Sequence, residues 1–316
     1  MRLLITRPMP EAVVTRANAE FEVEVRSANT PLEQGEMLRA LREFDAVIPT
    51  LGDGFSGDVF GQVANPRCRL LANFGVGYNH IDVEAAKSAG VQVTNTPGAV
   101  TDATADIGMT LMLMSARRAG EGERLVRAGA WAGWHPTQML GLHISGKTVG
   151  IVGMGRIGQA VARRCHYGFG MQVHYFSRSP KDLDFPAIAM GDLVELAGSV
   201  DVLVVCVPGS PQTHHMIGAP VFRAMRRTGH LINIARGDIV DEGALIAALD
   251  AGEIAGAGLD VYEFEPKVPQ ALKQMEQVTL LPHMGTAAQE VREAMGIMAL
   301  DNVAALAKGQ VLPNAV

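Results

Sequence analysis

The chain has 316 residues, of which 48% are hydrophobic and 19% charged, and its net charge is -6. This composition is typical of a folded protein of about two domains with a large core, and it excludes extended disorder. The Lys and Arg residues are scattered and form no basic run, so we expect no nucleic-acid partner.

The cysteines and the chain's apolar segments indicate a cellular compartment. Three cysteines, Cys68, Cys165 and Cys206, form neither a C-x-x-C pair nor an even framework, as is typical of a reducing cytoplasm. The segment MRLLITRPMP has too short an apolar core for a signal peptide, and the apolar segment IGMTLMLMSA is too short to cross a membrane. We therefore expect a cytoplasmic protein with no membrane segment, and we find no metal-ligand cluster.

Short β-rich segments recur through the first hundred residues, namely RLLIT, FEVEV, DAVIPT, RLLANFG and VQVTNT. Helix-like stretches such as PLEQGEMLRALREF and DVEAAKSAG lie between them. This alternation predicts a parallel sheet that is covered by helices on both faces.

The segment from Thr101 to about Arg118 is apolar nearly all round and opens with Thr101 and Asp102 as candidate N-caps. We expect a buried helix here, whose methionines serve packing and not cofactor binding. Because no partner for this helix is evident within the chain, we expect an isologous homodimer.

A glycine-rich turn follows near the middle of the chain, in KTVGIVGMGRIG. Gly153, Gly155 and Gly158 have the G-x-G-x-x-G spacing, in which the glycines permit a tight turn, close approach of a pyrophosphate, and close packing of helix on strand. The helix that starts at Arg156 and Ile157 would direct its N-terminus at the anion. A strand before the turn and a helix after it support a dinucleotide site.

A second series of β-rich segments follows this turn: MQVHYFS, DVLVVCV, GHLINIA, IAGAGLDV and VTLLPH. We therefore expect two α/β units in one chain. The first of these segments ends with Ser177 and Arg178, where an NAD site normally has an acid about 20 residues after the glycine turn. A hydroxyl and a guanidinium can bind a 2′-phosphate, so we expect NADPH to be preferred, with NADH possible. The alternative is an NAD ribose contacted by Asp182 or Asp184.

Several motifs in the same order resemble those of one family. They are NFGVGYNHIDVEAAKSAGVQVTNTPGAVTDATAD, GIVGMGRIGQAVARR, INIARGDIVDEGAL, AGLDVYEFEP and LLPHMG. The chain is similar over essentially its whole length to the D-isomer-specific 2-hydroxyacid dehydrogenases, in the glyoxylate/hydroxypyruvate reductase branch. The resemblance implies an α/β fold with two doubly wound parallel-sheet domains. A Rossmann nucleotide-binding domain, residues 98–286, would be inserted into a flavodoxin-like substrate domain made of residues 1–97 and 287–316, with Pro97 and Gly98 as plausible hinge residues.

The resemblance assigns three catalytic residues, and their chemistry is consistent with it. Arg236 matches the arginine that holds the carboxylate and carbonyl of the substrate, because a guanidinium offers two parallel hydrogen bonds. His283 matches the acid/base, since an imidazole titrates near working pH. Glu265 matches the acid that orients this ring and favours its charged form.

The resemblance also assigns residues that bind substrate and cofactor. The backbone N–H groups of Val76 and Gly77 would hold the substrate carboxylate, and Leu51 and Gly52 would form a variable wall of the pocket. Trp134 resembles a tryptophan that reaches the partner subunit's substrate pocket; simple interface packing is the alternative. Asp260 matches the residue that faces the nicotinamide carboxamide. We interpret His80 as a structural residue.

These features predict an NADPH-dependent reductase of small 2-keto acids, with glyoxylate and hydroxypyruvate first. One alternative is a reductase of bulkier 2-keto acids. Another is a dinucleotide-sensing binding protein on the same fold, like the family's corepressors, which can retain the same three catalytic residues. The minimal two-domain length and the absence of an appended recognition tail favour an enzyme. Formate dehydrogenase, a relative, is disfavoured because its site lacks the glutamate.

Overall fold

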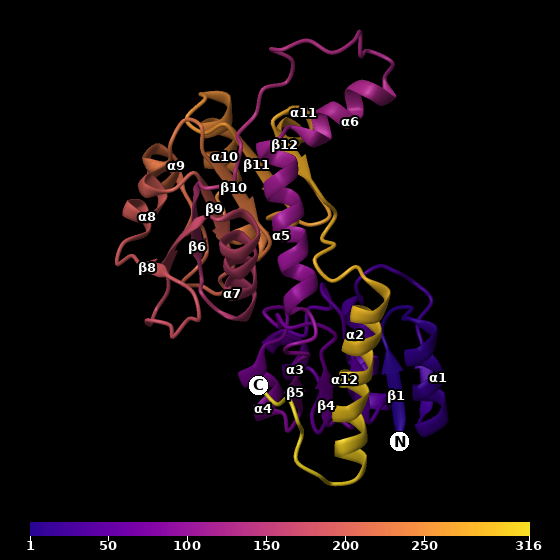
Figure 1. Ribbon diagram of the computed structural model, residues 1–316. Helices are drawn as coiled ribbons and strands as arrows, with labels where there is room; N and C mark the ends of the chain where they lie inside the picture. Colours follow the sequence, from indigo (N-terminus) through magenta and orange to yellow (C-terminus); the bar gives the residue numbers. More distant parts are fainter. The chain divides into compact units, whose positions relative to one another are not determined.

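The computed structural model describes residues 1–316, and the chain divides into two compact units. Unit 1 comprises residues 1–100 and 286–316, and unit 2 comprises residues 101–285 (Figure 1). Unit 2 is therefore contiguous in sequence and interrupts unit 1.

The chain has no membrane-spanning helix, no disulfide and no cluster of metal-ligating side chains. Among the helices, none combines the length and the apolar character that a membrane crossing requires. All three cysteines are free thiols, and two of them, Cys68 and Cys165, are buried. No three His, Cys, Asp or Glu residues lie in an arrangement that would hold a metal ion.

Unit 1 contains a five-stranded parallel sheet with the strand order β2-β1-β3-β4-β5, which is the flavodoxin-like order. The strands are β1 (Arg2–Ile5), β2 (Glu22–Val25), β3 (Ala46–Ile48), β4 (Leu70–Ala72) and β5 (Gln92–Thr94). The helices are α1 (Glu11–Glu20), α2 (Gln34–Glu43), α3 (Gly57–Gly61), α4 (Val83–Ser88) and α12 (Gln289–Ala307). The five β-rich segments expected in the first hundred residues are thus all strands.

Helices cover both faces of this sheet. Because side chains alternate along a strand, Leu3 and Ile5 pack on one face with α1 and α12, whereas Leu4 packs on the other with α2, α3 and α4. The contact of α12 with α1 is close: a Cβ added at Gly296 would lie 2.4 Å from Val13 Cγ2. The last helix of the chain therefore completes a core that begins with the first strand (Figure 1).

Unit 2 contains a seven-stranded parallel sheet with the order β12-β11-β10-β9-β6-β7-β8, the Rossmann order with one additional strand. The strands are β6 (Thr148–Val152), β7 (Gln172–Phe176), β8 (Ala187–Ala189), β9 (Val202–Val205), β10 (His230–Asn233), β11 (Gly256–Leu259) and β12 (Val278–Leu280). The helices are α5 (Thr101–Ala116), α6 (Ala119–Arg127), α7 (Arg156–Arg163), α8 (Leu193–Ser199), α9 (Ala219–Ala224), α10 (Glu242–Asp250) and α11 (Gln270–Gln274). The sequence patterns omitted only the edge strand β8. Unit 2 is thus a second doubly wound sheet.

The partner of α5 lies within unit 2, so the prediction that this helix has no intrachain partner is wrong. A Cβ added at Gly108 of α5 would lie 3.0 Å from Ile234, and one added at Gly258 of β11 would lie 3.0 Å from Leu111 of α5. These contacts place α5 on one face of the sheet, where its buried residues share a core with α7, β6 and β10. The apolar character of α5 is thus no sign of a second subunit.

Candidate active site

The glycine turn between β6 and α7 forms a cradle that only glycine permits. Gly153 has a φ of +99°, and a Cβ at this position would lie 2.7 Å from the backbone N of Val207. A Cβ at Gly158 would lie 2.1 Å from the carbonyl oxygen of Gly153. Gly155, by contrast, has no heavy atom within 4 Å of its Cβ position, so the backbone is open to a ligand before the first turn of α7. This geometry fits the pyrophosphate of a dinucleotide at a helix N-terminus.

Residues Ser177 and Arg178 lie beside this cradle. The N–H of Gly153 donates to the carbonyl of Phe176, the last residue of β7, at 2.9 Å. Ser177 directly follows this strand, and Arg178 is exposed to solvent. Lys181, which the sequence patterns did not indicate, donates from Nζ to Ser179 Oγ at 2.9 Å and adds a second cation to the same loop.

The two acids considered as alternatives for the ribose differ in their surroundings. Asp184 forms an ion pair with Arg163, with 2.8 Å between Oδ2 and Nη1, and its carbonyl accepts the Tyr167 hydroxyl at 2.9 Å. Asp184 is thus held on the side of α7 by two interactions. Asp182 has no hydrogen bond or ion pair within the chain.

Glu265 and His283 form a hydrogen-bonded pair at the carboxyl edge of the unit 2 sheet. His283 Nδ1 lies 2.8 Å from Glu265 Oε2, and the two side chains are 30% and 28% exposed. The other carboxylate oxygen of Glu265 accepts the N–H of Tyr262 at 3.0 Å. Burial alone raises the pKa of Glu265, but His283, the Tyr262 amide and Arg236 together lower it below its usual value. An ionised Glu265 makes Nδ1 the donor and directs Nε2 of the ring away from the carboxylate.

Asp260 holds the backbone around His283. Its carbonyl accepts the N–H of His283 at 2.8 Å, and its carboxylate accepts the N–H groups of Met284 at 2.7 Å and Gly285 at 2.8 Å. His283 itself has a φ of +51°, a left-handed conformation that a non-glycine residue keeps only when its surroundings hold it. Burial raises the pKa of Asp260, although the two amides and His283 oppose this effect. Asp260 therefore orients the histidine segment.

Arg236 follows β10 and lies on a loop that touches the loop of Glu265. A Cβ at Gly237 would lie 1.8 Å from the carbonyl carbon of Tyr262, so the two loops are in direct backbone contact. Arg236 is half-buried. Burial lowers the pKa of its guanidinium, although the negative charges of Glu265 and Asp238 act in the opposite direction and raise it. The ends of β10, β11 and β12 thus bring Arg236, Glu265 and His283 to one edge of one sheet.

Val76 and Gly77 belong to unit 1, on the turn after β4. Their carbonyls are held inward: Asn95 Nδ2 donates to Val76 O at 2.9 Å, and Asn73 Nδ2 donates to Gly77 O at 3.0 Å. His80 Nε2 lies 3.0 Å from the Oδ1 of Asn73, a contact that is compatible with the structural role we expected for this histidine. The N–H groups of Val76 and Gly77 donate to no protein acceptor, so both are available to an anion.

Leu51 and Gly52 also belong to unit 1 and lie on a turn after β3. Gly52 has a φ of +92°, and Arg7 Nη1 donates to the carbonyl of Leu51 at 2.8 Å. The buried carboxylate of Asp53 accepts the N–H of Leu32 at 2.9 Å and the hydroxyl of Thr6 at 2.6 Å. This turn is therefore rigidly anchored, while the Leu51 side chain itself is 38% exposed.

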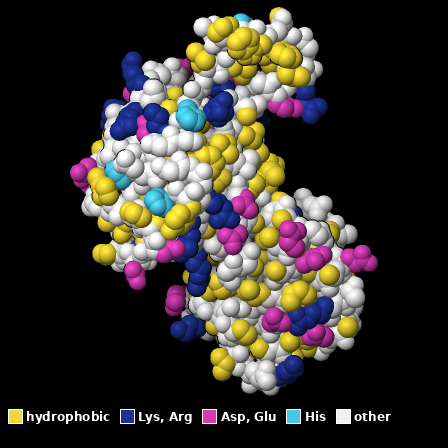
Figure 2. All heavy atoms as spheres, in the orientation of Figure 1, with side chains coloured by type: hydrophobic (Ala, Val, Ile, Leu, Met, Phe, Trp, Pro, Cys, Tyr) yellow, Lys and Arg dark blue, Asp and Glu magenta, His cyan; other side chains and the backbone are white.

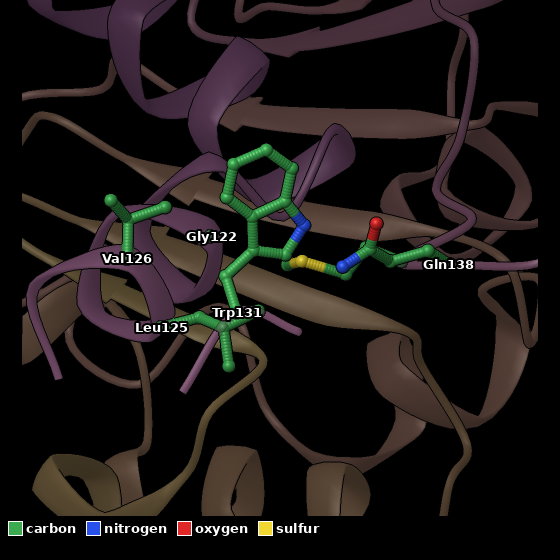
Figure 3. Close-up of a pocket in the computed structure, with 6 residues that line it drawn as sticks. Gly122, Leu125, Val126, Trp131 and Gln138 are labelled. Carbon is green, nitrogen blue, oxygen red and sulfur yellow. The ribbon is translucent and has the colours of Figure 1, made fainter. Parts of the chain in front are cut away.

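Trp134 lies on an arm formed by α6 and the loop that follows it, which extends away from the sheet of unit 2 (Figure 1). The helix α6 has no buried residue, and Trp134 is 78% exposed. Apolar side chains gather on this arm (Figure 2), where Val126, Trp131 and Leu140 are also more than half exposed. A hollow of about 250 Å³ on the arm is lined by residues that include Leu125, Val126, Trp131 and Met139 (Figure 3).

The sequence patterns did not indicate the residues that hold these functional groups in place. Asn73 in the turn of Val76, Asp53 in the turn of Leu51, and Tyr262 beside Glu265 act through hydrogen bonds to backbone groups. Asn73 and Asp53 stand at or just after the end of a β-rich segment, and this position was the signal available in the sequence.

Comparison with known proteins assigns the chain to a family. Residues 109–285 match the model of the D-isomer specific 2-hydroxyacid dehydrogenase, NAD binding domain. A glyoxylate reductase from Thermococcus kodakarensis is 43% identical, with 100% of this chain and 96% of the relative covered. A glyoxylate reductase from Aeropyrum pernix is 40% identical over 100% of this chain and 95% of its own.

Solved structures agree with this assignment. The structure of an NADPH-dependent glyoxylate/hydroxypyruvate reductase from Sinorhizobium meliloti, in complex with NADP and malonate, has a TM-score of 0.89 and 35% identity, covering 100% of this chain and 96% of that chain. A protein from Thermus thermophilus has a TM-score of 0.92 and 40% identity over 100% of both chains. The chain therefore belongs to the D-isomer-specific 2-hydroxyacid dehydrogenases, in the branch of the glyoxylate reductases, and is an NAD(P)-dependent dehydrogenase.

Proposed function

We propose that the protein reduces small 2-keto acids, glyoxylate and hydroxypyruvate first, with NADPH as the preferred cofactor and His283 as the proton donor. The observation that carries the proposal is the Glu265–His283 pair, in which an ionised carboxylate holds Nδ1 at 2.8 Å and leaves Nε2 free to face a ligand. The pair lies on the same sheet edge as Arg236 and in the same unit as the glycine cradle.

The residues divide the chemistry between them. When a reduced nicotinamide is bound beside the glycine turn of unit 2, it would supply a hydride for the keto carbon. Arg236 of unit 2 would hold the carboxylate and the ketone oxygen through two parallel hydrogen bonds. In unit 1, the N–H groups of Val76 and Gly77 donate to no protein acceptor and are, by the family resemblance, candidate donors to a carboxylate. His283 gives its Nε2 proton to the ketone oxygen, which becomes the hydroxyl of the product. The ring is then neutral, and its Nδ1–H remains hydrogen-bonded to Glu265.

The loop after β7 supports the preference for NADPH. No acid occupies position 177, where an acid would repel a 2′-phosphate, and Arg178 and Lys181 place two cations on the same loop. Asp184, one of two acids considered for an NAD ribose, is already paired with Arg163 at 2.8 Å. The relative from Sinorhizobium meliloti, described as NADPH-dependent and in complex with NADP, is consistent with this choice.

We propose that unit 2 binds the cofactor and carries the catalytic residues, and that unit 1 carries further substrate-binding groups. The turn of Leu51 and Gly52 would then limit the size of the keto acid. Asp53 and Arg7 hold this turn, so it would set a fixed limit. We favour small substrates because relatives 40% to 43% identical to the chain are glyoxylate reductases. A reductase of bulkier 2-keto acids and a dinucleotide-sensing binding protein remain the alternatives.

We also propose a homodimer, formed by the apolar arm of α6 and its loop. Several large apolar side chains on the arm are exposed together, which is unusual for a surface that faces only solvent. In a second copy of this chain, the same arm would be the natural partner of such a surface.

One experiment tests the proposed activity. A panel of 2-keto acids, from glyoxylate and hydroxypyruvate to phenylpyruvate, is assayed with NADPH and with NADH by the loss of absorbance of the reduced cofactor. We expect the highest kcat/KM for glyoxylate or hydroxypyruvate with NADPH. A higher value for phenylpyruvate would support the bulkier class, and binding of NADPH without turnover of any keto acid would support the binding protein.

A further inference from the structure

A second pair of a histidine and a carboxylate lies on the carboxyl edge of the unit 2 sheet. His215 Nε2 is 2.9 Å from Glu263 Oε1, and the side chains are 36% and 14% exposed. His215 lies on the loop between β9 and α9, and Glu263 lies on the loop after β11. The reaction described above uses neither residue.

This pair ties together the loops that carry the proposed catalytic residues. The backbone N–H of His215 donates to the carbonyl of Asp238 at 2.8 Å, two residues after Arg236. Glu263 stands two residues before Glu265, and its own N–H donates to Oε1 of the buried Glu242 at 3.0 Å. The side-chain contact therefore links the loops after β9 and β11, and the backbone hydrogen bond of His215 links them to the loop after β10.

The hydrogen bond between His215 and Glu263 lies in a region where several carboxylates are close together. Burial raises the pKa of Glu242, and the nearby charges of Glu263 and Glu265 raise it further, although the N–H of Glu263 opposes them. Two carboxyl groups of this loop, those of Glu263 and Glu265, thus lie near a third, that of Glu242 at the start of α10. Without the donor that His215 supplies, the mostly buried carboxylate of Glu263 would lose a hydrogen bond next to two other acids, and the loop would relax away from them.

We infer that His215 and Glu263 are positioning residues that hold Glu265 and Arg236 in register for the reduction. This inference rests on the proposed function for its catalytic consequence, whereas the restraint on the loop follows from the contacts alone. Small displacements of positioning groups lower turnover strongly, because the reacting atoms must be held within a fraction of an ångström.

The test uses four single variants of the full chain and the double variant that combines His215→Asn with Glu263→Ala. In His215→Asn the side chain is too short to reach Glu263, but asparagine tolerates the φ of +50° at this position. Glu263→Ala removes the carboxylate that His215 contacts. Glu263→Gln keeps an acceptor oxygen and serves as the conservative rescue. His174→Asn is the matched control, since His174 also makes one side-chain hydrogen bond, to Ser199 Oγ at 3.1 Å, away from these loops.

We expect His215→Asn and Glu263→Ala each to lower kcat for glyoxylate at least about tenfold, with the NADPH dissociation constant unchanged within about twofold in a fluorescence titration. The double variant should be no worse than either single variant, because both remove one contact. Glu263→Gln and His174→Asn should stay near wild type. A wild-type kcat in His215→Asn, or a Glu263→Gln variant as impaired as Glu263→Ala, would overturn the inference.

Hydrogen–deuterium exchange of the segment 260–266 separates this inference from the proposed function. We expect faster exchange there in His215→Asn and Glu263→Ala, but not in the other two variants. If the wild type reduces no 2-keto acid, the proposed function fails, and the exchange data alone decide whether the restraint exists. Unchanged exchange in His215→Asn would reject it.

Discussion

His230 provides a quantitative link between burial and pH-dependent stability. It is the first residue of β10, is only 5% exposed, and its Nδ1 lies 2.8 Å from Ser115 Oγ of α5. Burial lowers the pKa of this imidazole from 6.5 to about 4. Each pKa unit corresponds to about 1.36 kcal/mol, so the difference amounts to about 3 kcal/mol between the folded and unfolded chains.

The sign follows from proton binding. As the pH falls below about 6.5, the unfolded chain binds a proton at His230 while the folded chain does not, so the free energy of unfolding decreases until the folded pKa is reached. The contribution of neutral His230 is fully present above pH 6.5 and is lost toward pH 4. We expect His230→Asn to lower stability at pH 7 by removing packed ring atoms but to abolish this part of the pH dependence.

Urea unfolding followed by circular dichroism from pH 8 to pH 4.5 measures the effect. Other titrating groups are shared by both proteins, so they cancel in the difference between wild type and variant. We expect this difference to shrink by most of the 3 kcal/mol, about 1.4 kcal/mol for each pH unit below 6.5. Parallel pH profiles for the two proteins would refute the reasoning, and His135→Asn on the exposed arm provides the control.

Four further outcomes test the site and the assembly. His283→Ala should lower kcat at least about 100-fold while NADPH binding is retained, because general acid catalysis contributes on this scale; wild-type turnover in the folded variant would reject the proton donor. Arg236→Lys should impair KM and kcat for the keto acid together, since a point charge cannot bind at two points, and an unchanged KM would remove this residue from the site. Arg178→Ala should lower kcat/KM for NADPH about tenfold with a much smaller change for NADH, and Ser177→Asp should shift the ratio further toward NADH; an unchanged ratio in both variants would contradict our assignment of this loop. Light scattering should give twice the 33.6 kDa mass of one chain, with Trp134→Ser weakening the dimer, whereas only monomer at micromolar concentration would contradict it.

The parallel sheets followed from the sequence because their strands are continuous β-rich runs bounded by turns. The strand β8 (Ala187–Ala189) was not predicted, because it is only three residues long and lies mostly exposed at the sheet edge. Such a short exposed strand has no clear pattern of hydrophobic residues. The helix α5 was expected to be buried, but its partner was not found. Its contacts with Ile234 and Gly258 join residues more than 100 positions apart, which no local pattern reveals.

The candidate catalytic residues were easier to predict than the residues that position them through hydrogen bonds. Motif positions indicated Glu265 and His283, and the structure brings them to 2.8 Å. Asp260 was expected only beside a nicotinamide, yet its carboxylate also binds two amides after His283. The pair of His215 and Glu263 joins two loops 48 residues apart, and only the folded sheet brings such loops together.

The way unit 1 is assembled has a consequence for the order in which the chain folds during synthesis. One face of its sheet, with Leu3, Ile5 and Leu70, is covered in part by Ala299, Leu300 and Val303 of α12. The ribosome makes α12 only after the whole of unit 2, which is contiguous and able to fold as it emerges. The first hundred residues must therefore wait with the part of this apolar sheet face that α1 does not cover exposed. During this interval the nascent chain is most exposed to aggregation and most in need of a chaperone.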